Sequence, residues 1–420
     1  MKNRKDFELL APVGSYESLH AAIKAGADAV YFGAENLNMR ASSSINFTLS
    51  DLKNIADICS QNSVKTYLTL NTVIFDHEME QMKNIVDSVK NSNIHGIIAS
   101  DMAVIQYARS IGVEVHASTQ LNISNVDAVR FFAQFCDVMV TARELSLEQV
   151  KHITQQIKQE NICGPSGNRV RIETFVHGAL CMAISGKCYL SLHETGKSAN
   201  RGTCRQTCRK SYVVTEKETA YQLEIDNQYI MSPKDLCTIP FFDKIIEAGI
   251  QVLKIEGRAR GPEYVYRTVD CYNQALEAVL ENCYNPDKIS QWEERLSTVF
   301  NRGFWDGYYL GKPLGEWSKR YGSQATKRKM YIAKAINYFS NLEVAEFKME
   351  SGELKTGDEI IITGPTTGII EMHIPEIRVN EKNVEKTVKG EHFSIPVPEI
   401  VRRSDKMYCM LNEDEIKNIQ

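Results

Sequence analysis

Eight short apolar segments follow one another along the first two-thirds of the chain, and amphipathic segments separate most of them. They cover residues 9–12, 28–33, 64–71, 96–100, 113–118, 138–141, 170–177 and 251–256. Strands that are apolar on both faces and alternate with helices are typical of a parallel sheet that helices cover. About eight such units favour a closed barrel over an open sheet. The pattern therefore predicts an α/β chain with a TIM-like (β/α) barrel.

Helical patterns lie between the predicted strands, at residues 16–26, 51–60, 79–92, 103–111 and 147–159. One strand–helix unit is interrupted, because an irregular insertion rich in Gly and Cys occupies residues 178–237. After the last predicted strand, apolar residues at helical spacing predict a long helix over residues 263–281.

The character of the sequence changes near residue 325. Beyond this point, short alternating strands are broken by Gly, Asn and Asp turns, which is typical of a small antiparallel β-barrel or sandwich. We therefore predict a TIM-like barrel domain with its insertion over residues 1–325 and a small β-barrel domain over residues 326–420. The strands of the second domain are expected at residues 331–336, 342–347, 358–364, 368–374, 392–397 and 406–411.

The composition predicts a soluble protein of the cytoplasm. The 420 residues carry a formal net charge of −4, and 43% of them are hydrophobic. The polar N-terminus argues against a secretory leader, and no apolar run approaches the ~20 residues of a membrane span. Without an overall basic charge, any nucleic acid would have to bind a local basic patch. The sequence indicates no oligomeric state.

Eleven cysteines are present, and five of them fall within 57 positions. An odd number without a secretory leader argues against a disulfide framework. Cysteines in apolar patterns, such as Cys59, Cys136 and Cys271, are expected to be small core residues. Because thiolates are soft ligands, four of the clustered cysteines together would select zinc or an iron–sulfur cluster. The clustered five are Cys181, Cys188, Cys204, Cys208 and Cys237.

The spacing of these cysteines favours an iron–sulfur cluster over zinc. Structural zinc sites usually use pairs separated by about two to four residues, and only Cys204 and Cys208 follow that rule. The irregular spacing of the others suits a cluster whose iron atoms lie at the corners of a cube. Zinc and inert cysteines stay open as alternatives. The preferred ligands are Cys181, Cys188, Cys204 and Cys208, with Cys237 as the rival for the fourth position.

Five segments carry a resemblance that covers nearly the whole chain. They read ELLAPVGSYESLHAAIKAGADAVYFG, ETFVHGALCMAISGKCYLS, NRGTCRQTCR, MSPKDL and VLKIEGR. In these motifs the chain resembles the large family historically filed as collagenase-like peptidases of unknown mechanism, the peptidase U32 type. The resemblance implies a barrel-like N-terminal domain, a 4Fe-4S cluster on cysteines and hydroxylase activity. The substrates in this family are quinone precursors, 23S ribosomal RNA or tRNA.

In its length and its C-terminal β domain, the chain is most similar to the tRNA-acting members. This resemblance implies formation of 5-hydroxyuridine at the wobble position with prephenate as co-substrate, so the implied partners are a tRNA anticodon loop and a small anion. The ligand set differs within the family. Some members carry Arg where this chain has Cys237, and others carry a later cysteine and lack the equivalent of Cys208. Since this chain has both cysteines, both ligand sets stay open.

Basic residues near the cysteines and near the domain junction could neutralise RNA phosphates. Around the cysteines they are Arg201, Arg205, Arg209 and Lys210, and at the junction they are Lys319, Arg320, Lys327, Arg328 and Lys329. Aromatic residues that could stack an unpaired base are Tyr189, Trp305, Tyr308, Tyr309 and Trp317. The alternative is that the basic residues solvate loops and offset the charge of a cluster.

Polar side chains follow several predicted strands, where a barrel builds its active-site rim. Strand ends are polar in many proteins, so the set counts for more than any member. The candidates for binding a carboxylate are Arg143, Lys254 and Arg258. The candidates for proton transfer are His116, His177, Asp235 and Glu256. Only one of Lys254 and Glu256 is expected to face the barrel interior.

Three classes of function stay open: an RNA hydroxylase, a hydroxylase of quinone precursors, and a collagenase-like peptidase. The peptidase has the least support, because the sequence contains neither an HExxH zinc motif nor a GxSxG nucleophile elbow. The preferred prediction is a tRNA uridine 5-hydroxylase.

Overall fold

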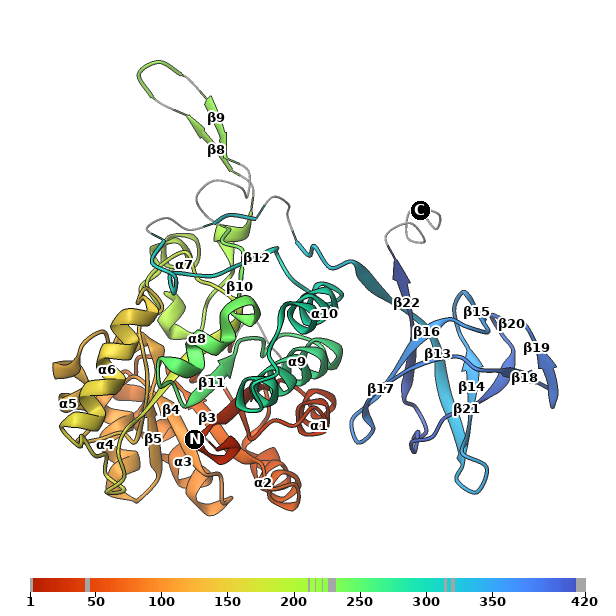
Figure 1. The fold of residues 1–420 in the computed structure, drawn as a ribbon, viewed down its shortest axis with the longest axis horizontal. Coiled ribbons are helices and arrows are strands. Elements are labelled where there is room, and N and C mark those ends of the chain that lie inside the picture. The colour runs from red at the N-terminus through yellow and green to blue at the C-terminus, as the bar shows by residue number, and fades with distance from the viewer. Residues whose placement is uncertain are drawn as a thin grey trace.

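The computed structural model describes residues 3–41, 46–210, 212–215, 217–220, 222–225, 232–312, 316–318 and 322–412. Its N-terminal part is a closed barrel of eight parallel strands (Figure 1). The strands are β1 (Glu8–Pro12), β2 (Ala29–Gly33), β3 (Lys65–Leu70), β4 (Gly96–Ala99), β5 (Glu114–Ala117), β6 (Val138–Val140), β7 (Arg171–Ala179) and β11 (Val252–Ile255). They pair in that order, and β11 closes the ring by pairing with both β7 and β1. Each strand matches one predicted segment, so the TIM-like barrel is confirmed.

Helices surround the barrel (Figure 1). They are α1 (Tyr16–Lys24), α2 (Leu52–Gln61), α3 (Met79–Asn91), α4 (Met102–Ser110), α5 (Val126–Phe132), α6 (Leu147–Gln159), α8 (Phe242–Glu247), α9 (Pro262–Leu280) and α10 (Pro286–Ser297). The helix predicted over residues 16–26 ends at Lys24, because Gly26 adopts a left-handed φ of +85° that leads the chain into β2. No helix in the described ranges is long and apolar enough to cross a membrane.

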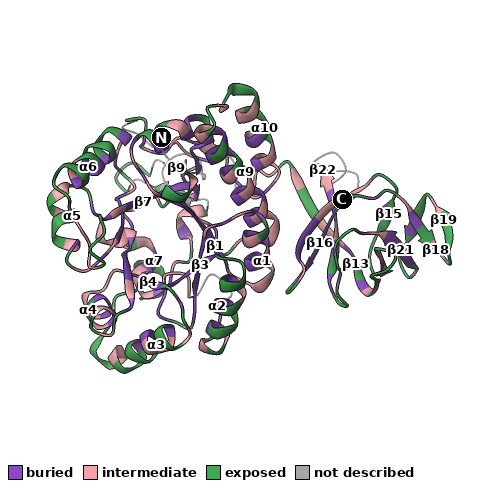
Figure 2. Ribbon diagram, turned by 60° about the horizontal axis from the view of Figure 1, so that its bottom comes forward, coloured by how far each residue is buried: buried purple, intermediate pink, exposed green. Residues whose placement is uncertain are grey.

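The barrel strands are buried on both faces, as their nearly continuous apolar sequences require. Figure 2 shows the buried residues concentrated along the barrel and the inner sides of the helices. A smaller apolar cluster fills the barrel itself, and it consists of Leu10, Ala29, Tyr31, Tyr67, Ile98, Val138 and Val252. His116 packs on the ring of Tyr67 and Lys254 lies over the ring of Tyr31, so charged groups share this interior.

The insertion leaves the barrel after β7 and lies over its C-terminal rim. It contains α7 (Tyr189–Thr195), and a hairpin of β8 (Tyr212–Thr215) and β9 (Gln222–Ile225) extends away from the barrel (Figure 1). The chain returns as β10 (Asp235–Cys237), which pairs antiparallel with the end of β7 and parallel with β12 (Phe304–Trp305). The return strand therefore anchors the far end of the insertion to the barrel.

The C-terminal domain is an antiparallel sheet of eight strands. In sheet order they are β17 (Gly368–His373), β16 (Glu359–Gly364), β22 (Lys406–Asn412), β13 (Lys327–Phe339), β14 (Val344–Met349), β21 (His392–Pro396), β18 (Ile377–Val379) and β19 (Lys382–Val384). A short ladder of β15 (Glu353–Lys355) and β20 (Lys386–Val388) accompanies them. All six predicted strands are present, so a separate antiparallel β domain is confirmed; the four shortest strands were not predicted.

The two domains contact each other through α1 and α9. Ala21 of α1 packs against three residues of the sheet, Ile361, Ile369 and Met410. Beside this apolar contact, Arg267 of α9 pairs with Glu359 at 3.1 Å and with Glu371 at 2.7 Å. The C-terminal domain therefore attaches to the outer helical wall of the barrel.

Candidate active site

A pocket of about 200 Å³ lies at the C-terminal rim of the barrel. The ends of the strands contribute Tyr31, Thr69, Asn71, Ser118, Arg143, Phe175, Lys254, Glu256 and Arg258. The insertion contributes further residues between Ala179 and Arg209. Because barrel enzymes build their active sites at this rim, the pocket is the candidate active site.

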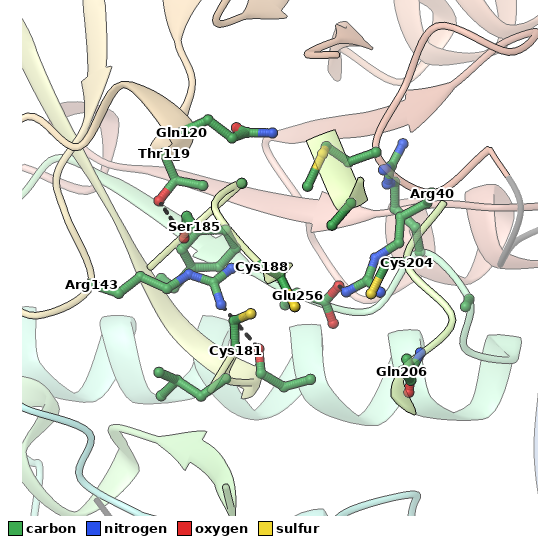
Figure 3. Close-up of a pocket in the computed structure, with 18 of the residues that line it drawn as sticks. Arg40, Thr119, Gln120, Arg143, Cys181, Ser185, Cys188, Cys204, Gln206 and Glu256 are labelled. Atoms are coloured by element: carbon green, nitrogen blue, oxygen red, sulfur yellow. Dashed lines mark hydrogen bonds and ion pairs between the residues drawn. The ribbon is translucent and has the colours of Figure 1, made fainter. Parts of the chain in front are cut away.

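Four of the five clustered cysteines line this pocket, namely Cys181, Cys188, Cys204 and Cys208. Figure 3 shows Cys181, Cys188 and Cys204 around the same cavity, and all four are free thiols. Burial is the main reason that the pKa of Cys208 is raised to about 11; Arg209 opposes this rise, and the nearby Cys181, Cys204 and Cys188 add to it. The four thiols are therefore electrostatic neighbours.

The four pocket thiols form a soft donor set made of sulfur alone. Within the part of the chain that the structure describes, no three His, Cys, Asp or Glu side chains converge closely enough to hold one metal ion. A zinc ion requires its sulfur ligands at ~2.3 Å from one point. A 4Fe-4S cluster is held by four thiolates on separate iron atoms, so its ligands stand further apart. The donor set, which is soft and entirely sulfur, fits such a cluster.

The fifth cysteine, Cys237, lies outside the pocket lining. Its side chain is 3% exposed, and Sγ accepts a hydrogen bond from the Tyr272 hydroxyl at 3.9 Å. Burial raises the pKa of Cys237 to about 12, so it is a neutral core thiol. The expectation that its strand ends on the shared rim is wrong, because β10 runs antiparallel to β7 and places Cys237 opposite His177.

Positive charge dominates the pocket. Its cationic side chains are Arg40, Arg143, Arg209, Lys254, Arg258, Arg260 and Arg302. Against these seven, the described lining has one carboxylate, Glu256, which pairs with Arg40 at 2.8 Å (Figure 3). Burial raises the pKa of Glu256, but Arg40, Arg260 and Arg143 outweigh it and lower that pKa. Glu256 is therefore ionised, and the surplus positive charge suits an anionic ligand.

Two of the predicted anion-binding residues, Arg143 and Arg258, are held mainly by neutral groups. Arg143 donates to the Ala179 carbonyl at 3.3 Å and lies 4.0 Å from the centre of the Phe175 ring, while its Nε has no hydrogen-bond partner among the described residues. Arg258 donates to the Thr69 hydroxyl at 2.6 Å, and burial lowers its pKa to about 10. Their charge is available to a bound anion.

The third predicted anion-binding residue, Lys254, also lines the pocket. Its Nζ pairs with Glu173 at 2.5 Å, and burial lowers the pKa of Lys254 although Glu173 opposes this. Lys254 and Glu256 both line the pocket, so the expectation that only one of them faces inward is wrong. Residues two apart on a strand point to the same side.

Three of the predicted proton-transfer residues lie outside the pocket lining. His116 is fully buried inside the barrel. His177 packs against the rings of Tyr264 and Tyr272, and burial lowers its pKa to about 3, so it is a neutral core histidine rather than a rim residue. Asp235 is buried on β10, where burial raises its pKa, and its 3.1 Å ion pair with Arg302 connects it to the pocket lining.

Arg209 lines the pocket and connects the two ends of the insertion. Its guanidinium donates to the carbonyl oxygens of Leu180 at 2.7 Å and Pro233 at 2.5 Å. Leu180 immediately precedes Cys181, and Arg209 immediately follows Cys208. Arg209 therefore acts as a positioning residue for the cysteines.

The other three basic residues that were predicted around the cysteines lie outside the pocket lining. Arg201 pairs with Glu78 at 2.5 Å, and this hydrogen bond lowers the pKa of Glu78 to about 2. Lys210 pairs with Glu194 at 2.8 Å. Arg205 is exposed and forms no ion pair with any residue that the structure describes. Its charge is therefore more accessible to a phosphate than the charges of Arg201 and Lys210.

Two of the five basic residues at the domain junction form ion pairs. Lys327 pairs with Glu359 of β16, and Lys329 pairs with Glu263 of α9. Arg328 is exposed. Lys319 and Arg320 lie outside the described residues. The junction therefore supports an RNA contact less than the insertion does.

The predicted stacking aromatics differ in exposure. Tyr189 is 72% exposed at the start of α7. Trp305 and Tyr309 are buried, and Tyr308 and Trp317 are half-buried. Only Tyr189 of these five presents a largely open ring.

A model of peptidase family U32 matches residues 14–319. The chain belongs to peptidase family U32. This U32 protein is 60% identical over 413 residues to a Porphyromonas gingivalis protein named collagenase, covering 98% of this chain and 100% of the relative. It is 32% identical to the tRNA hydroxylation protein P1 of Bacillus subtilis, covering 85% of this chain and 83% of the relative. It is 29% identical to a 23S rRNA 5-hydroxycytidine synthase of Escherichia coli, covering 87% of this chain and 57% of that protein.

Sequence reasoning missed three cations of the U32 protein's pocket, Arg40, Arg260 and Arg302. Arg260 lies two positions after Arg258, in the same turn after β11, and that spacing was a usable signal. Arg40 and Arg302 come from irregular segments far apart in the chain. No local pattern marks them, because only the closed barrel brings those segments to one rim.

Proposed function

We propose that this U32 protein is an iron–sulfur-dependent tRNA hydroxylase that forms 5-hydroxyuridine at the wobble position with prephenate as co-substrate. The observation that carries the proposal is that four thiols and seven cations line one pocket at the barrel rim. The names of two relatives, tRNA hydroxylation protein and 23S rRNA 5-hydroxycytidine synthase, support RNA as the substrate class. The wobble uridine and prephenate follow from the sequence resemblance.

The four pocket cysteines would hold the 4Fe-4S cluster, and a bound cluster supplies electron transfer at the pocket. Cations beside the sulfur atoms partly oppose the burial that disfavours thiolates. The pKa of Arg40 is raised, chiefly by Glu256 and also by Cys204, so Arg40 stays cationic beside the sulfur ligands. Arg209 favours the thiolate form of Cys208 in the same way. The chain thus compensates the negative charge that such a cofactor brings.

The co-substrate would bind through its carboxylates to the guanidinium groups of the pocket. A guanidinium matches the two oxygens of a carboxylate in parallel hydrogen bonds. Arg143 and Arg258 follow β6 and β11, the strands on either side of β7, so they can hold an anion between them over the rim. Lys254 lies in the same lining and can approach an oxygen of the bound anion.

RNA would reach the pocket from the side of the insertion. A base that undergoes chemistry must leave its stack to enter a pocket, and an open aromatic ring can hold it. Tyr189 directly follows Cys188, and the exposed Arg205 directly follows Cys204. A stacking ring and a phosphate-binding charge therefore lie next to the pocket cysteines.

A collagenase-like peptidase is the second candidate, because a relative at 60% identity carries that name. The site supports it less. A cysteine nucleophile requires a neighbouring base, and the described lining of the pocket includes no histidine. Its one carboxylate, Glu256, is engaged by Arg40.

Mass spectrometry of tRNA nucleosides from a strain lacking this gene tests the function. We expect 5-hydroxyuridine and its derivatives to disappear, and to return with the wild-type gene but not with Cys204→Ala. Cys163→Ala is the matched control, because Cys163 lies outside the pocket and should restore modification fully. Unchanged tRNA would refute the proposal; a quinone defect would then indicate the small-molecule hydroxylase, and cleavage of gelatin by the purified protein would indicate the peptidase.

Anaerobic purification tests the cofactor separately. We expect a brown protein with about four iron atoms per chain, and a colourless protein from Cys204→Ala. The Cys163→Ala control should keep its iron. A colourless wild-type protein that binds one zinc ion would contradict the cluster.

A further inference from the structure

Four titratable side chains form a continuous series through the barrel interior and end in the pocket. They are Glu114, His116, Glu173 and Lys254. Nε2 of His116 lies 3.1 Å from Oε1 of Glu114, and Nδ1 of His116 lies 3.5 Å from Oε2 of Glu173. The other carboxylate oxygen of Glu173 lies 2.5 Å from Nζ of Lys254, which lines the pocket.

The two ends of this series are accessible, and its middle is not. The side chains of His116 and Glu173 are both 0% exposed. Glu114 has a 37% exposed side chain and begins β5, so it lies at the end of the barrel opposite the pocket. Ionisable groups buried in a protein interior cost free energy even when they are paired. The series therefore connects solvent at the N-terminal face with the pocket through a buried interior.

The centre of the series is poised for transfer. Nδ1 of His116 and Oε2 of Glu173 have no hydrogen-bond partner among the described residues, yet they face each other at 3.5 Å. An unpaired buried polar atom is unfavourable, and a shift of a few tenths of an ångström would join these two atoms. A proton on the imidazole can then pass to the carboxylate.

We propose that this series is a proton relay that supplies Lys254, and that Lys254 protonates an oxygen of the substrate or co-substrate in the pocket. The ammonium of Lys254 gives one proton to an oxyanion and becomes an amine. Glu173 passes to that amine a proton accepted from Nδ1 of the His116 imidazolium, and the remaining imidazole keeps its proton on Nε2. A turn of the ring then brings the unprotonated nitrogen to Glu114, from which it regains a proton that comes from solvent. Each step moves one proton and no electrons. The inference rests on the pocket being the active site of the proposed function.

Neighbouring charges tune the relay. Burial lowers the pKa of His116, but Glu114 and Glu173 outweigh burial and raise it above the ordinary value. Burial lowers the pKa of Lys254, so the two nitrogen bases lie closer in proton affinity, which favours transfer. The other titratable or charged groups that face the series are Glu8, Tyr31, Lys65, Tyr67, His95, Arg143, Arg171 and Arg258.

The kinetic test uses the cluster-loaded enzyme with tRNA and prephenate between about pH 6 and 9. We expect Glu173→Gln to lower kcat roughly 100-fold with little change in the KM for prephenate, and Glu173→Asp to recover part of it. Glu114→Gln should slow the enzyme less and should shift its pH profile. Tyr67→Phe is the matched control, because Tyr67 packs on His116 at a ring distance of 4.1 Å without joining the series, and it should retain activity. Equal kcat in Glu173→Gln and wild type would overturn the relay.

A second readout does not depend on activity. The protein has nine histidines, and selective ¹⁵N labelling with His116→Asn identifies the signal of His116. We expect its imidazolium form to persist above pH 6.5 in the wild type and to titrate at lower pH in Glu173→Gln. A neutral imidazole at every pH tested in both proteins would overturn the relay but leave the proposed function intact. Failure of the function would instead appear as unmodified tRNA with the wild-type enzyme.

Discussion

Replacing Arg209 by Met should loosen the segment that carries the cysteines. The change keeps a side chain of similar length but removes three hydrogen bonds, to the Leu180 carbonyl at 2.7 Å, the Pro233 carbonyl at 2.5 Å and the Ser232 hydroxyl at 3.0 Å. A net contribution of about 1 kcal/mol for each bond gives about 3 kcal/mol in total. Since each 1.4 kcal/mol or so is a factor of ten, local opening should become roughly 100-fold more frequent.

Hydrogen exchange of the metal-free protein measures this opening directly. Amides between residues 207 and 210, such as that of Lys210, which donates to the Thr207 carbonyl, should exchange roughly 100-fold faster in Arg209→Met than in wild type. Arg205→Met is the matched control, because Arg205 is exposed and its loss should change nothing. The reasoning is refuted if the two variants exchange alike, or if the iron content of Arg209→Met equals that of wild type after anaerobic reconstitution.

Three further predictions concern stability and ligand assignment. Cys237→Ala should keep its full iron content while the free energy of unfolding in urea falls by about 1 kcal/mol; loss of iron would return Cys237 to the ligand set. Burial opposes ionisation of Glu8, but Arg171 and its neighbours lower that pKa from 4.5 to about 2. This lowered pKa contributes about 3 kcal/mol of stability above pH 4.5 that is lost as the pH falls to 2. The urea midpoint of Glu8→Gln should therefore fall less between pH 4.5 and 2 than that of wild type. An equal fall in both proteins would contradict this. Arg267→Met leaves Glu359 and its neighbouring carboxylate without their shared cation; we expect about 3 kcal/mol of destabilisation, and a urea midpoint like that of wild type would disprove it.

The barrel could be predicted because its strands are buried on both faces. The apolar run over residues 28–33 contains β2, whose five residues are all buried, and it matches that strand within one residue at each end. A short apolar segment between amphipathic helices is typical of a strand in a parallel sheet that helices cover, where its backbone groups form hydrogen bonds with neighbouring strands. The position of Arg143, Lys254 and Arg258 at the rim could also be predicted, because the C-terminal ends of the strands in a closed barrel share one edge.

The direction of β10 could not be predicted, and the placement of Cys237 failed with it. An isolated three-residue strand has the same pattern whether it runs parallel or antiparallel to its neighbour, and its pairing with β7 is a long-range contact. The prediction that His177 lies on the rim failed for a related reason. A histidine near a strand end has the same sequence signature on the rim and in the core, and only the packing of Tyr264 and Tyr272 around it decides.

The four pocket cysteines come from 28 consecutive residues, and the barrel closes through β7 and β11 without them. For the proposed cluster, construction of the scaffold and installation of the inorganic centre would be separable events. A chain whose centre has been destroyed by oxidation should keep its shape and accept a new one. Repair of the proposed cluster would then require only fresh iron and sulfide rather than synthesis of a new polypeptide.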